Sequence, residues 1–167
     1  MFIIFMGVSG SGKTTIGTQV AARWGVPYYE GDAYHPPENV LKMAQGIPLT
    51  DVDRVEWLNA LSQLIGEKLA AGESGVLSCS ALKEDYRKRL QVDPDQVHFI
   101  FLDGSYELIQ KRMEARQDHY MPTALLRSQF DTLERPEDVF PIEIDQPVEE
   151  ILREASSYLQ RIGFSSG

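Results

Sequence analysis

The stretch Gly7-Val8-Ser9-Gly10-Ser11-Gly12-Lys13-Thr14 decides how the rest of the chain is interpreted. It fits the phosphate-binding loop (P-loop) pattern, in which a glycine is followed by four residues and then by Gly-Lys-Ser/Thr. The apolar residues 2–6 precede it and a plausible helix over 14–24 follows it, which is the strand-loop-helix context that the motif requires. The pattern therefore predicts a site for the phosphates of a nucleotide.

The residue types in this loop suit that task. Glycines let the backbone N–H groups turn toward phosphate oxygens, and the helix that begins there adds the positive end of its dipole. Lys13 can reach the β- and γ-phosphates, and the Thr14 hydroxyl can bind Mg²⁺. The residues expected to contact the nucleotide here are Gly7, Ser9, Gly10, Ser11, Gly12, Lys13, Thr14 and Thr15.

Composition favours one soluble domain spanning residues 1–167. Hydrophobic residues make up 43% and charged residues 25%, as is usual for a globular protein. The net charge of −9 argues against nonspecific nucleic-acid binding, which needs Lys and Arg to neutralise phosphates. No apolar run is long enough to span a bilayer and residues 1–6 lack a basic flank, so we expect a cytoplasmic protein without membrane contact. The single cysteine, Cys79, excludes an internal disulfide and is expected in the core.

Strand and helix signals alternate along the chain, which predicts an α/β fold of the P-loop type with a five-stranded parallel sheet flanked by helices. The expected strands are residues 2–6, 27–30, 75–80, 98–102 and 140–145. The expected helices are residues 14–24, 37–45, 51–71, 83–90, 106–116, a segment ending at 134, and 148–162. The expected core stripe of the long helix is Val55, Leu58, Leu61, Ile65 and Leu69. Pro141 indicates an edge position for the last strand, and ligands are expected beyond the carboxyl ends of the strands.

Asp32 is the first candidate outside the loop, because it follows the second strand and should face this edge of the sheet. An aspartate there can accept the proton of a substrate hydroxyl or orient that hydroxyl for phosphoryl transfer, although a turn or a helix cap would also explain it. His35 could bond a substrate or could be a surface-loop residue. No acidic residue ends the third strand, so Mg²⁺ would depend on Thr14, the nucleotide and Asp32 through water.

Three arginines stand where a cation is unfavourable without an anionic partner. Arg54 lies in the first turn of the long helix, where its charge opposes the helix dipole. Arg112 and Arg116 are spaced i, i+4, so that on one helix face their charges repel at a cost of about 0.2–0.5 kcal/mol. A bound polyphosphate would reverse that effect, so we expect both arginines at a lid of about residues 112–124, with a solvated helix face as the alternative.

Further motifs follow the P-loop in order along the chain. They are Gly31-Asp32-x-x-His35-Pro36, Asn39-x-x-Lys42-Met43-x-x-Gly46-x-Pro48-Leu49-x-Asp51-x-Asp53-Arg54-x-x-Trp57-Leu58, Cys79-Ser80-Ala81-Leu82-Lys83-x-x-Tyr86-Arg87 and Leu126-x-Ser128-Gln129. Together they resemble the gluconate kinase family of small P-loop carbohydrate kinases. Two positions depart from that family's pattern: Val52 stands where an acidic residue is common, and Asp118 stands where a glycine precedes the lid histidine.

The resemblance implies transfer of the γ-phosphate of ATP to the 6-hydroxyl of D-gluconate, with Mg²⁺. It also implies a fold similar to nucleoside monophosphate kinases and shikimate kinase, and usually a homodimer. Lys13, Asp32 and Arg116 would be catalytic, and Arg112 and Arg116 would meet the nucleotide from the lid. The sugar acid would be bound through a segment of about residues 31–58 and beyond it, by Asp32, His35, Arg54 and Lys83.

Two other functions remain open from the sequence. A P-loop kinase for another small acceptor, such as shikimate, a nucleotide or another sugar acid, is the nearest alternative. A nucleotide-dependent switch or binding module is more distant, because the chain has neither the Asn-Lys-x-Asp signature of guanine recognition nor a strand-end Asp-x-x-Gly. Measuring ATP consumption with and without each acceptor distinguishes a kinase from a switch and identifies the acceptor of the kinase.

Overall fold

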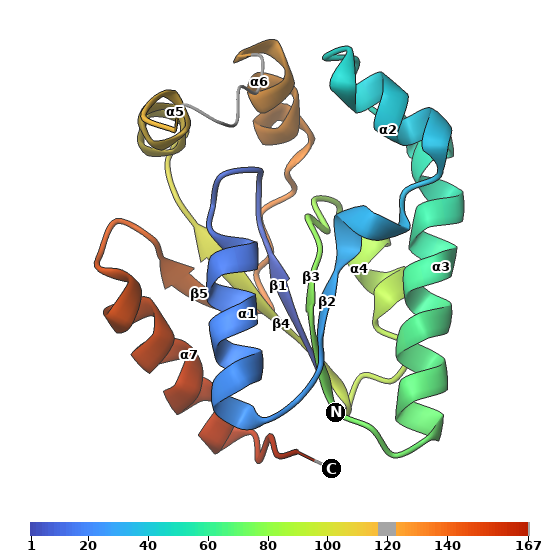
Figure 1. Cartoon of the computed structure of the whole chain (residues 1–167), viewed down its shortest axis with the longest axis vertical. Coiled ribbons are helices and arrows are strands. Elements are labelled where there is room, and N and C mark those ends of the chain that lie inside the picture. Colours follow the sequence, from blue (N-terminus) through green and yellow to red (C-terminus); the bar gives the residue numbers. More distant parts are fainter. Residues whose placement is uncertain (117–122, 167) are drawn as a thin grey trace.

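A parallel sheet forms the centre of the computed structural model, which describes residues 1–116 and 123–166 (Figure 1). Within that part of the chain the strands are β1 (Phe2–Met6), β2 (Tyr28–Glu30), β3 (Gly75–Ser78), β4 (Val97–Asp103) and β5 (Phe140–Glu143). They are ordered β2-β3-β1-β4-β5, and Phe2 of β1 is in register with Gly75 of β3 and Val97 of β4. All neighbouring pairs are parallel, which confirms the predicted sheet, and Pro141 lies on an edge strand as expected.

Helices cover both faces of the sheet, and further helices lie beyond the carboxyl ends of its strands. They are α1 (Lys13–Trp24), the 3-10 helix η1 (Gly31–Tyr34), α2 (Pro37–Ala44), α3 (Asp51–Ala70), α4 (Glu84–Leu90), α5 (Tyr106–Glu114), α6 (Thr123–Thr132) and α7 (Val148–Arg161). Figure 1 shows α1 and α7 on one face, α3 and α4 on the other, and α2, α5 and α6 beyond the carboxyl ends of the strands. The predicted helix and strand boundaries lie within two residues of those observed.

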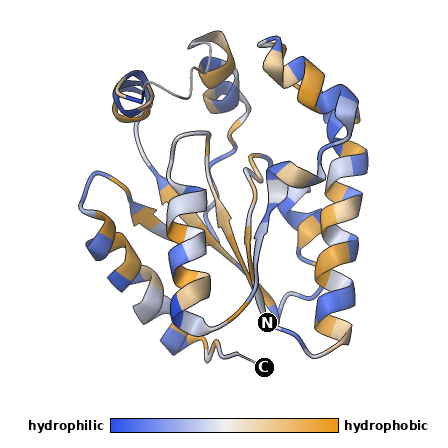
Figure 2. Ribbon diagram, viewed as in Figure 1, coloured by the Kyte–Doolittle hydropathy of each residue, from blue (hydrophilic) through white to orange (hydrophobic). Residues whose placement is uncertain are grey.

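Alternating side chains of β1 supply both halves of the core. Ile3 and Phe5 pack in a cluster with residues of α1 and α7, whereas Phe2, Ile4 and Met6 pack with residues of α3 and α4. All five are fully buried, as expected for a central parallel strand covered on both faces. Figure 2 shows this central strand as strongly hydrophobic, with hydrophilic residues on the outer faces of the helices. No helix of the described residues is long and apolar enough to cross a bilayer.

Helix α3 presents a different stripe to the core from the one predicted. Leu58, Leu61 and Ile65 are buried as expected, and Trp57 joins them with 1% of its surface exposed. Val55 was wrongly placed in the core, because it is 39% exposed. At about 100° per residue, Val55 lies roughly 120° around the helix from the direction that Trp57, Leu61 and Ile65 share, which is outside the buried face.

Cys79 follows β3 and is buried, as the sequence predicted. Burial raises the pKa of its thiol to about 12, with the backbone N–H of Ala81 acting in the opposite direction. The thiol is therefore protonated at neutral pH and serves as a small core side chain.

Candidate active site

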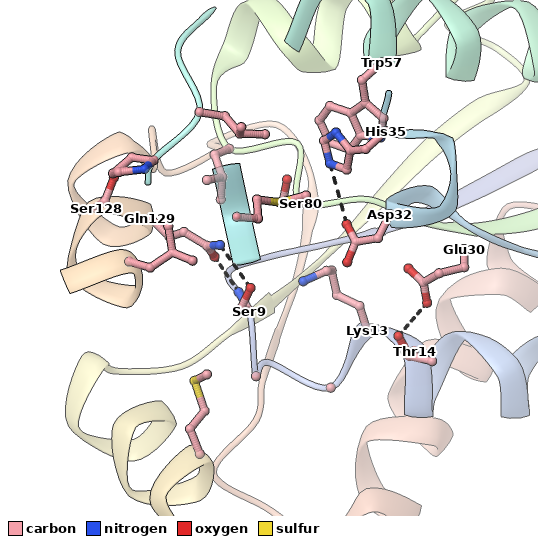
Figure 3. A pocket seen from close by; sticks show the side chains of 18 of the residues that line it. Ser9, Lys13, Thr14, Glu30, Asp32, His35, Trp57, Ser80, Ser128 and Gln129 are labelled. Carbon is pink, nitrogen blue, oxygen red and sulfur yellow. Dashed lines mark hydrogen bonds and ion pairs between the residues drawn. The ribbon is translucent and has the colours of Figure 1, made fainter. Parts of the chain in front are cut away.

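A pocket opens beyond the carboxyl ends of the strands, at the edge where the sequence predicted ligands (Figure 3). The P-loop forms one wall, the segment after β2 and the start of α3 form another, and α6 faces them. The polar residues that line it are Ser9, Lys13, Thr14, Thr15, Glu30, Asp32, His35, Arg54, Ser80, Arg116, Ser128 and Gln129. Gly10 and Gly12 line it through their backbone, whereas Gly7 and Ser11 lie in the buried part of the loop.

The P-loop backbone requires glycine at its first position and at the start of α1. A side chain at Gly7 would place its Cβ 2.9 Å from the carbonyl oxygen of Leu102, and the backbone there has a φ of +146°. Gly12 caps α1 in the left-handed region, with a φ of +97°. These conformations direct the loop around the space in front of the first turn of α1, where backbone N–H groups have no helical partner.

Lys13 lies folded against the loop that it belongs to. Its Nζ donates hydrogen bonds to the carbonyl oxygens of Gly7 and Val8, at 3.0 and 2.9 Å. Burial lowers the pKa of this ammonium, and the nearby Asp32 carboxylate opposes that shift. Figure 3 shows the Lys13 and Asp32 side chains facing the same pocket.

Glu30 is a pocket residue that the sequence reasoning missed. Thr14 Oγ1 and the Tyr28 hydroxyl each donate a hydrogen bond of 2.7 Å to Glu30 Oε2. The Tyr28 and Glu30 side chains share one side of β2, because they are two residues apart on a strand. Burial of the phenol raises the pKa of Tyr28 to about 12. The sequence signal was an acidic residue at the carboxyl end of a strand, two residues before Asp32.

Asp32 and His35 meet at one side of the pocket. Asp32 belongs to η1 and its side chain is 74% exposed, whereas the His35 side chain is 4% exposed. His35 Nε2 lies 3.9 Å from Asp32 Oδ1, and the imidazole stacks on the Trp57 ring with 4.2 Å between centroids. Burial lowers the pKa of His35, the Asp32 charge raises it, and Arg54 lowers it. The indole Nε1 of Trp57 donates to the Gly31 carbonyl at 2.8 Å, which fixes the ring against the start of η1.

The structure brings Arg54 into the pocket but not Lys83. Arg54 Nη1 donates to the Tyr86 hydroxyl at 3.2 Å, and that hydroxyl donates in turn to the Asp51 carboxylate. Lys83 Nζ lies 2.9 Å from Asp51 Oδ1 and is absent from the pocket lining. The first-turn carboxylate of α3 holds the lysine, and its contact with the sugar acid stays a prediction. The hydrogen bonds that Asp51 accepts lower the pKa of its carboxyl group, and the bond from Tyr86 has a larger effect than the bond from Lys83.

Arg112 and Arg116 do not share a helix face, contrary to the prediction. Helix α5 ends at Glu114, so Arg116 lies beyond it and lines the pocket. Arg112 remains in the last turn, and its Nη2 donates to the Ile144 carbonyl at 2.6 Å. The i, i+4 argument failed because the helix terminates between the two residues. Residues 117–122 of the expected lid, including Asp118, lie outside the described residues.

Proteins similar to this chain include several that are named kinases. A family model for shikimate kinase matches residues 9–141. A thermosensitive gluconokinase of Escherichia coli is 47% identical over 149 residues, which are 87% of this chain and 80% of that protein. The chain belongs to the gluconokinase family. A crystal structure of a gluconokinase from Sinorhizobium meliloti is 48% identical, with a TM-score of 0.87 over 96% of this chain and 91% of that one. A sugar kinase from Janibacter superposes with a TM-score of 0.89 at 42% identity, over 99% and 98% of the two chains.

Membership of the gluconokinase family confirms the resemblance that the motifs indicated, and with it the P-loop kinase fold and ATP as co-substrate.

One motif residue, Gln129, has a position that the sequence did not suggest. The backbone N–H of Ser9 donates to Gln129 Oε1 at 2.6 Å, and Gln129 Nε2 donates to Ser9 Oγ at 3.0 Å. Helix α6 is thereby joined to the P-loop at the pocket, across 120 residues of sequence.

Proposed function

We propose that this chain transfers the γ-phosphate of ATP to the 6-hydroxyl of D-gluconate, giving 6-phospho-D-gluconate and ADP. The observation that carries the proposal is its 47% identity, over most of its length, to a protein named gluconokinase. The pocket is compatible with that reaction, because it places a phosphate-binding loop opposite a carboxylate and a guanidinium. D-Gluconate carries a carboxylate and several hydroxyls, which need such polar partners.

The P-loop is the proposed site of the nucleotide phosphates. Its backbone N–H groups and the start of α1 would bind phosphate oxygens, together with the side chains of Lys13, Thr14 and Thr15. The Lys13 ammonium already lies at the loop, held by carbonyl oxygens that a phosphate group would replace as its partner. Its charge would then stabilise the phosphoryl group during transfer.

Asp32 is the proposed base. Its exposed carboxylate lies in the pocket that Lys13 also lines, on the side where an acceptor would bind. It would accept the proton of the acceptor hydroxyl as the oxygen forms its bond to phosphorus and the bond to ADP breaks. His35 and Arg54 are proposed to bind the sugar acid, with Arg54 opposite the carboxylate. A contact with Lys83 would require that ammonium to leave Asp51.

The surroundings of Thr14 suit a hard cation such as Mg²⁺. Hydroxyl and carboxylate oxygens are the donors that Mg²⁺ prefers, and Thr14, Glu30 and Asp32 all line the pocket. The described residues contain no group of three His, Cys, Asp or Glu that could hold a metal. We therefore propose that Mg²⁺ would bind with the nucleotide, through Thr14 and, by way of water, Asp32, with Glu30 beside them. Such an ion neutralises phosphate charge when bound.

Arg116 is the proposed catalytic residue of a lid over about residues 112–124. It lines the pocket, and an arginine that reaches the transferred phosphate stabilises its charge in other phosphoryl-transfer enzymes. Arg112 would contact the nucleotide only after releasing the Ile144 carbonyl. The proposed domain is the whole of residues 1–167, with an acceptor segment of about residues 31–58.

We also propose a cytoplasmic homodimer, on the basis of the motif resemblance. Exposed apolar side chains on α2 and at the start of α3, such as Leu41 at 60% and Val52 at 82%, offer a surface for self-association. Sedimentation velocity measures this directly. A single species with the mass of one chain at micromolar concentration would contradict the dimer.

A panel of acceptors tests the proposed reaction. ADP formation from ATP and Mg²⁺ is measured with D-gluconate, shikimate, a second sugar acid and a nucleoside monophosphate. We expect fast ADP formation with D-gluconate and slow background hydrolysis without an acceptor. Activity on shikimate or a nucleotide but not on gluconate would contradict the proposed acceptor, and slow hydrolysis that no acceptor accelerates would indicate a switch.

A further inference from the structure

Asn39 on α2 is a buried polar residue to which neither the motifs nor the proposed mechanism assigns a task. It is 3% exposed, and its side-chain nitrogen Nδ2 lies 2.7 Å from the Asp53 carbonyl oxygen and 3.3 Å from His35 Nδ1. The Lys42 ammonium, 2.9 Å from both carboxylate oxygens of Asp53, holds α2 against the start of α3. Asn39 therefore connects a fixed backbone carbonyl to the histidine of the acceptor pocket.

The carbonyl of Asp53 settles which way the Asn39 amide points. A carbonyl oxygen only accepts hydrogen bonds, so the atom that faces it must be the NH₂ group. The second hydrogen of that NH₂ group is then directed at His35 Nδ1. A nitrogen that receives a hydrogen bond must offer its lone pair, so Nδ1 of His35 carries no proton and the proton of the neutral ring is on Nε2.

The surroundings of His35 agree with a neutral ring. An imidazolium has N–H groups at both nitrogens, and its Nδ1–H would oppose the Asn39 NH₂ group. The charged groups that face the ring are Asp32 of η1 and Arg54 of α3, while Asn39 of α2 and Trp57 of α3 are uncharged. The imidazole orientation is fixed by the Trp57 stack.

We propose that Asn39 is a positioning residue that keeps His35 in its Nε2–H form, so that His35 donates a hydrogen bond to the acceptor substrate and cannot take its proton. Nε2 lies 3.9 Å from Asp32 Oδ1, too far for a direct hydrogen bond. An acceptor oxygen could receive a hydrogen bond from Nε2–H beside the Asp32 carboxylate. The two residues then have different tasks, His35 as donor and Asp32 as base. The consequence for catalysis rests on the proposed function, whereas the tautomer does not.

Nitrogen-15 NMR of the uniformly labelled wild-type chain tests the tautomer without any turnover. Two-bond correlations between ring protons and nitrogens distinguish a protonated from an unprotonated nitrogen, and the His35 signals are those missing from the spectrum of His35→Gln. We expect an unprotonated Nδ1 and a protonated Nε2 at neutral pH. A proton on Nδ1, in the neutral ring or in an imidazolium, would overturn the proposal even if the acceptor panel shows gluconate to be the substrate.

Two substitutions at His35 test the donor task. Glutamine can place an N–H group near the position of Nε2, and asparagine near that of Nδ1. We expect His35→Gln to retain at least roughly tenfold more kcat/KM for the acceptor than His35→Asn, with an unchanged KM for ATP. Equal or higher activity in His35→Asn would overturn the donor task. If the panel identifies another acceptor, the same comparison is made with that acceptor.

Asn39→Asp tests the positioning residue itself, because it replaces the donor by an acceptor of the same shape. We expect the NMR signals to show a proton on Nδ1 and kcat/KM for the acceptor to fall by roughly 10- to 100-fold, by analogy with residues that orient the histidine ligands of metal sites. Circular dichroism and a thermal melt establish that the variant is folded. A folded variant with an unchanged tautomer would overturn the proposal, and if it does not fold, the wild-type spectrum decides.

Discussion

Gly31→Ala is the substitution whose effect the structure specifies most closely. A Cβ at this position would lie 2.3 Å from the carbonyl oxygen of Ser78, at the point where β2 and β3 end side by side. The Ser78 oxygen belongs to the backbone and cannot rotate away as a flexible side chain could. The end of β2 and the start of η1 must therefore move by about 0.7 Å or more to restore a tolerable contact. Asp32 is the next residue, and a displacement of about 1 Å in a reacting group costs roughly 100-fold in rate.

Two measurements follow from this displacement. We expect Gly31→Ala to lower the free energy of unfolding by about 1–3 kcal/mol in a urea titration, because the contact is overpacked. We expect kcat to fall by roughly 100-fold while the affinity for ATP changes little.

Gly66→Ala is the matched control for this substitution. Gly66 lies within α3 with nothing within 4 Å of an added Cβ, so alanine there should stabilise the protein by about 0.5–1 kcal/mol at wild-type turnover. Wild-type stability and kinetics in Gly31→Ala would refute the close contact and the placement of Asp32 that depends on it.

Three further predictions concern charged residues. Asp32→Asn should lower kcat by roughly 10²–10⁴-fold with near-normal ATP binding by calorimetry, and wild-type turnover would remove Asp32 from the proposed role. Arg116→Ala should lower kcat by roughly 10³-fold or more, whereas Arg23→Ala, which replaces an exposed arginine of α1, should leave turnover unchanged; equal effects would contradict a contact with phosphate. Hydrogen bonds, of which the one from Lys42 has the largest effect, lower the pKa of Asp53 from 3.8 to about 2. The ionised Asp53 carboxylate therefore stabilises the folded state at neutral pH, and this stabilisation is lost as the pH falls toward 2. The difference in unfolding free energy between wild type and Asp53→Asn should therefore shrink as the pH falls from neutral toward 2, and a constant difference would contradict the ion pair with Lys42.

The fold was predictable because its signals are local. The P-loop, the apolar run before it and the alternation of strands and helices identify a parallel sheet, and Pro141 identifies an edge strand. Val55 was misplaced because hydrophobicity alone does not determine which side of α3 faces the sheet. Trp57 occupies that face although it carries a polar N–H, because the Gly31 carbonyl accepts a hydrogen bond from that group and the ring packs in the core.

The site was predictable where a residue carries a local signal, which is a position after a strand end for Asp32 and His35 and a charge in the first turn of a helix for Arg54. Asp32, His35 and Arg54 line the pocket as expected, because the topology brings their segments to one edge. The contacts of Lys83 and Arg112 were not predictable, since Asp51 and the Ile144 carbonyl reach them only through tertiary structure. The same holds for Gln129, whose hydrogen bonds to Ser9 join segments 120 residues apart.

Identification of the phosphorylated product tests the central claim most directly. The chain is incubated with ATP, Mg²⁺ and D-gluconate, and the product is examined by proton-coupled phosphorus-31 NMR. Transfer to the 6-hydroxyl yields a phosphate on a CH₂ carbon, whose signal is a triplet, and we expect this signal to grow in proportion to the ADP formed. A doublet, from a phosphate on a secondary carbon, or inorganic phosphate as the only product, would contradict the proposed reaction.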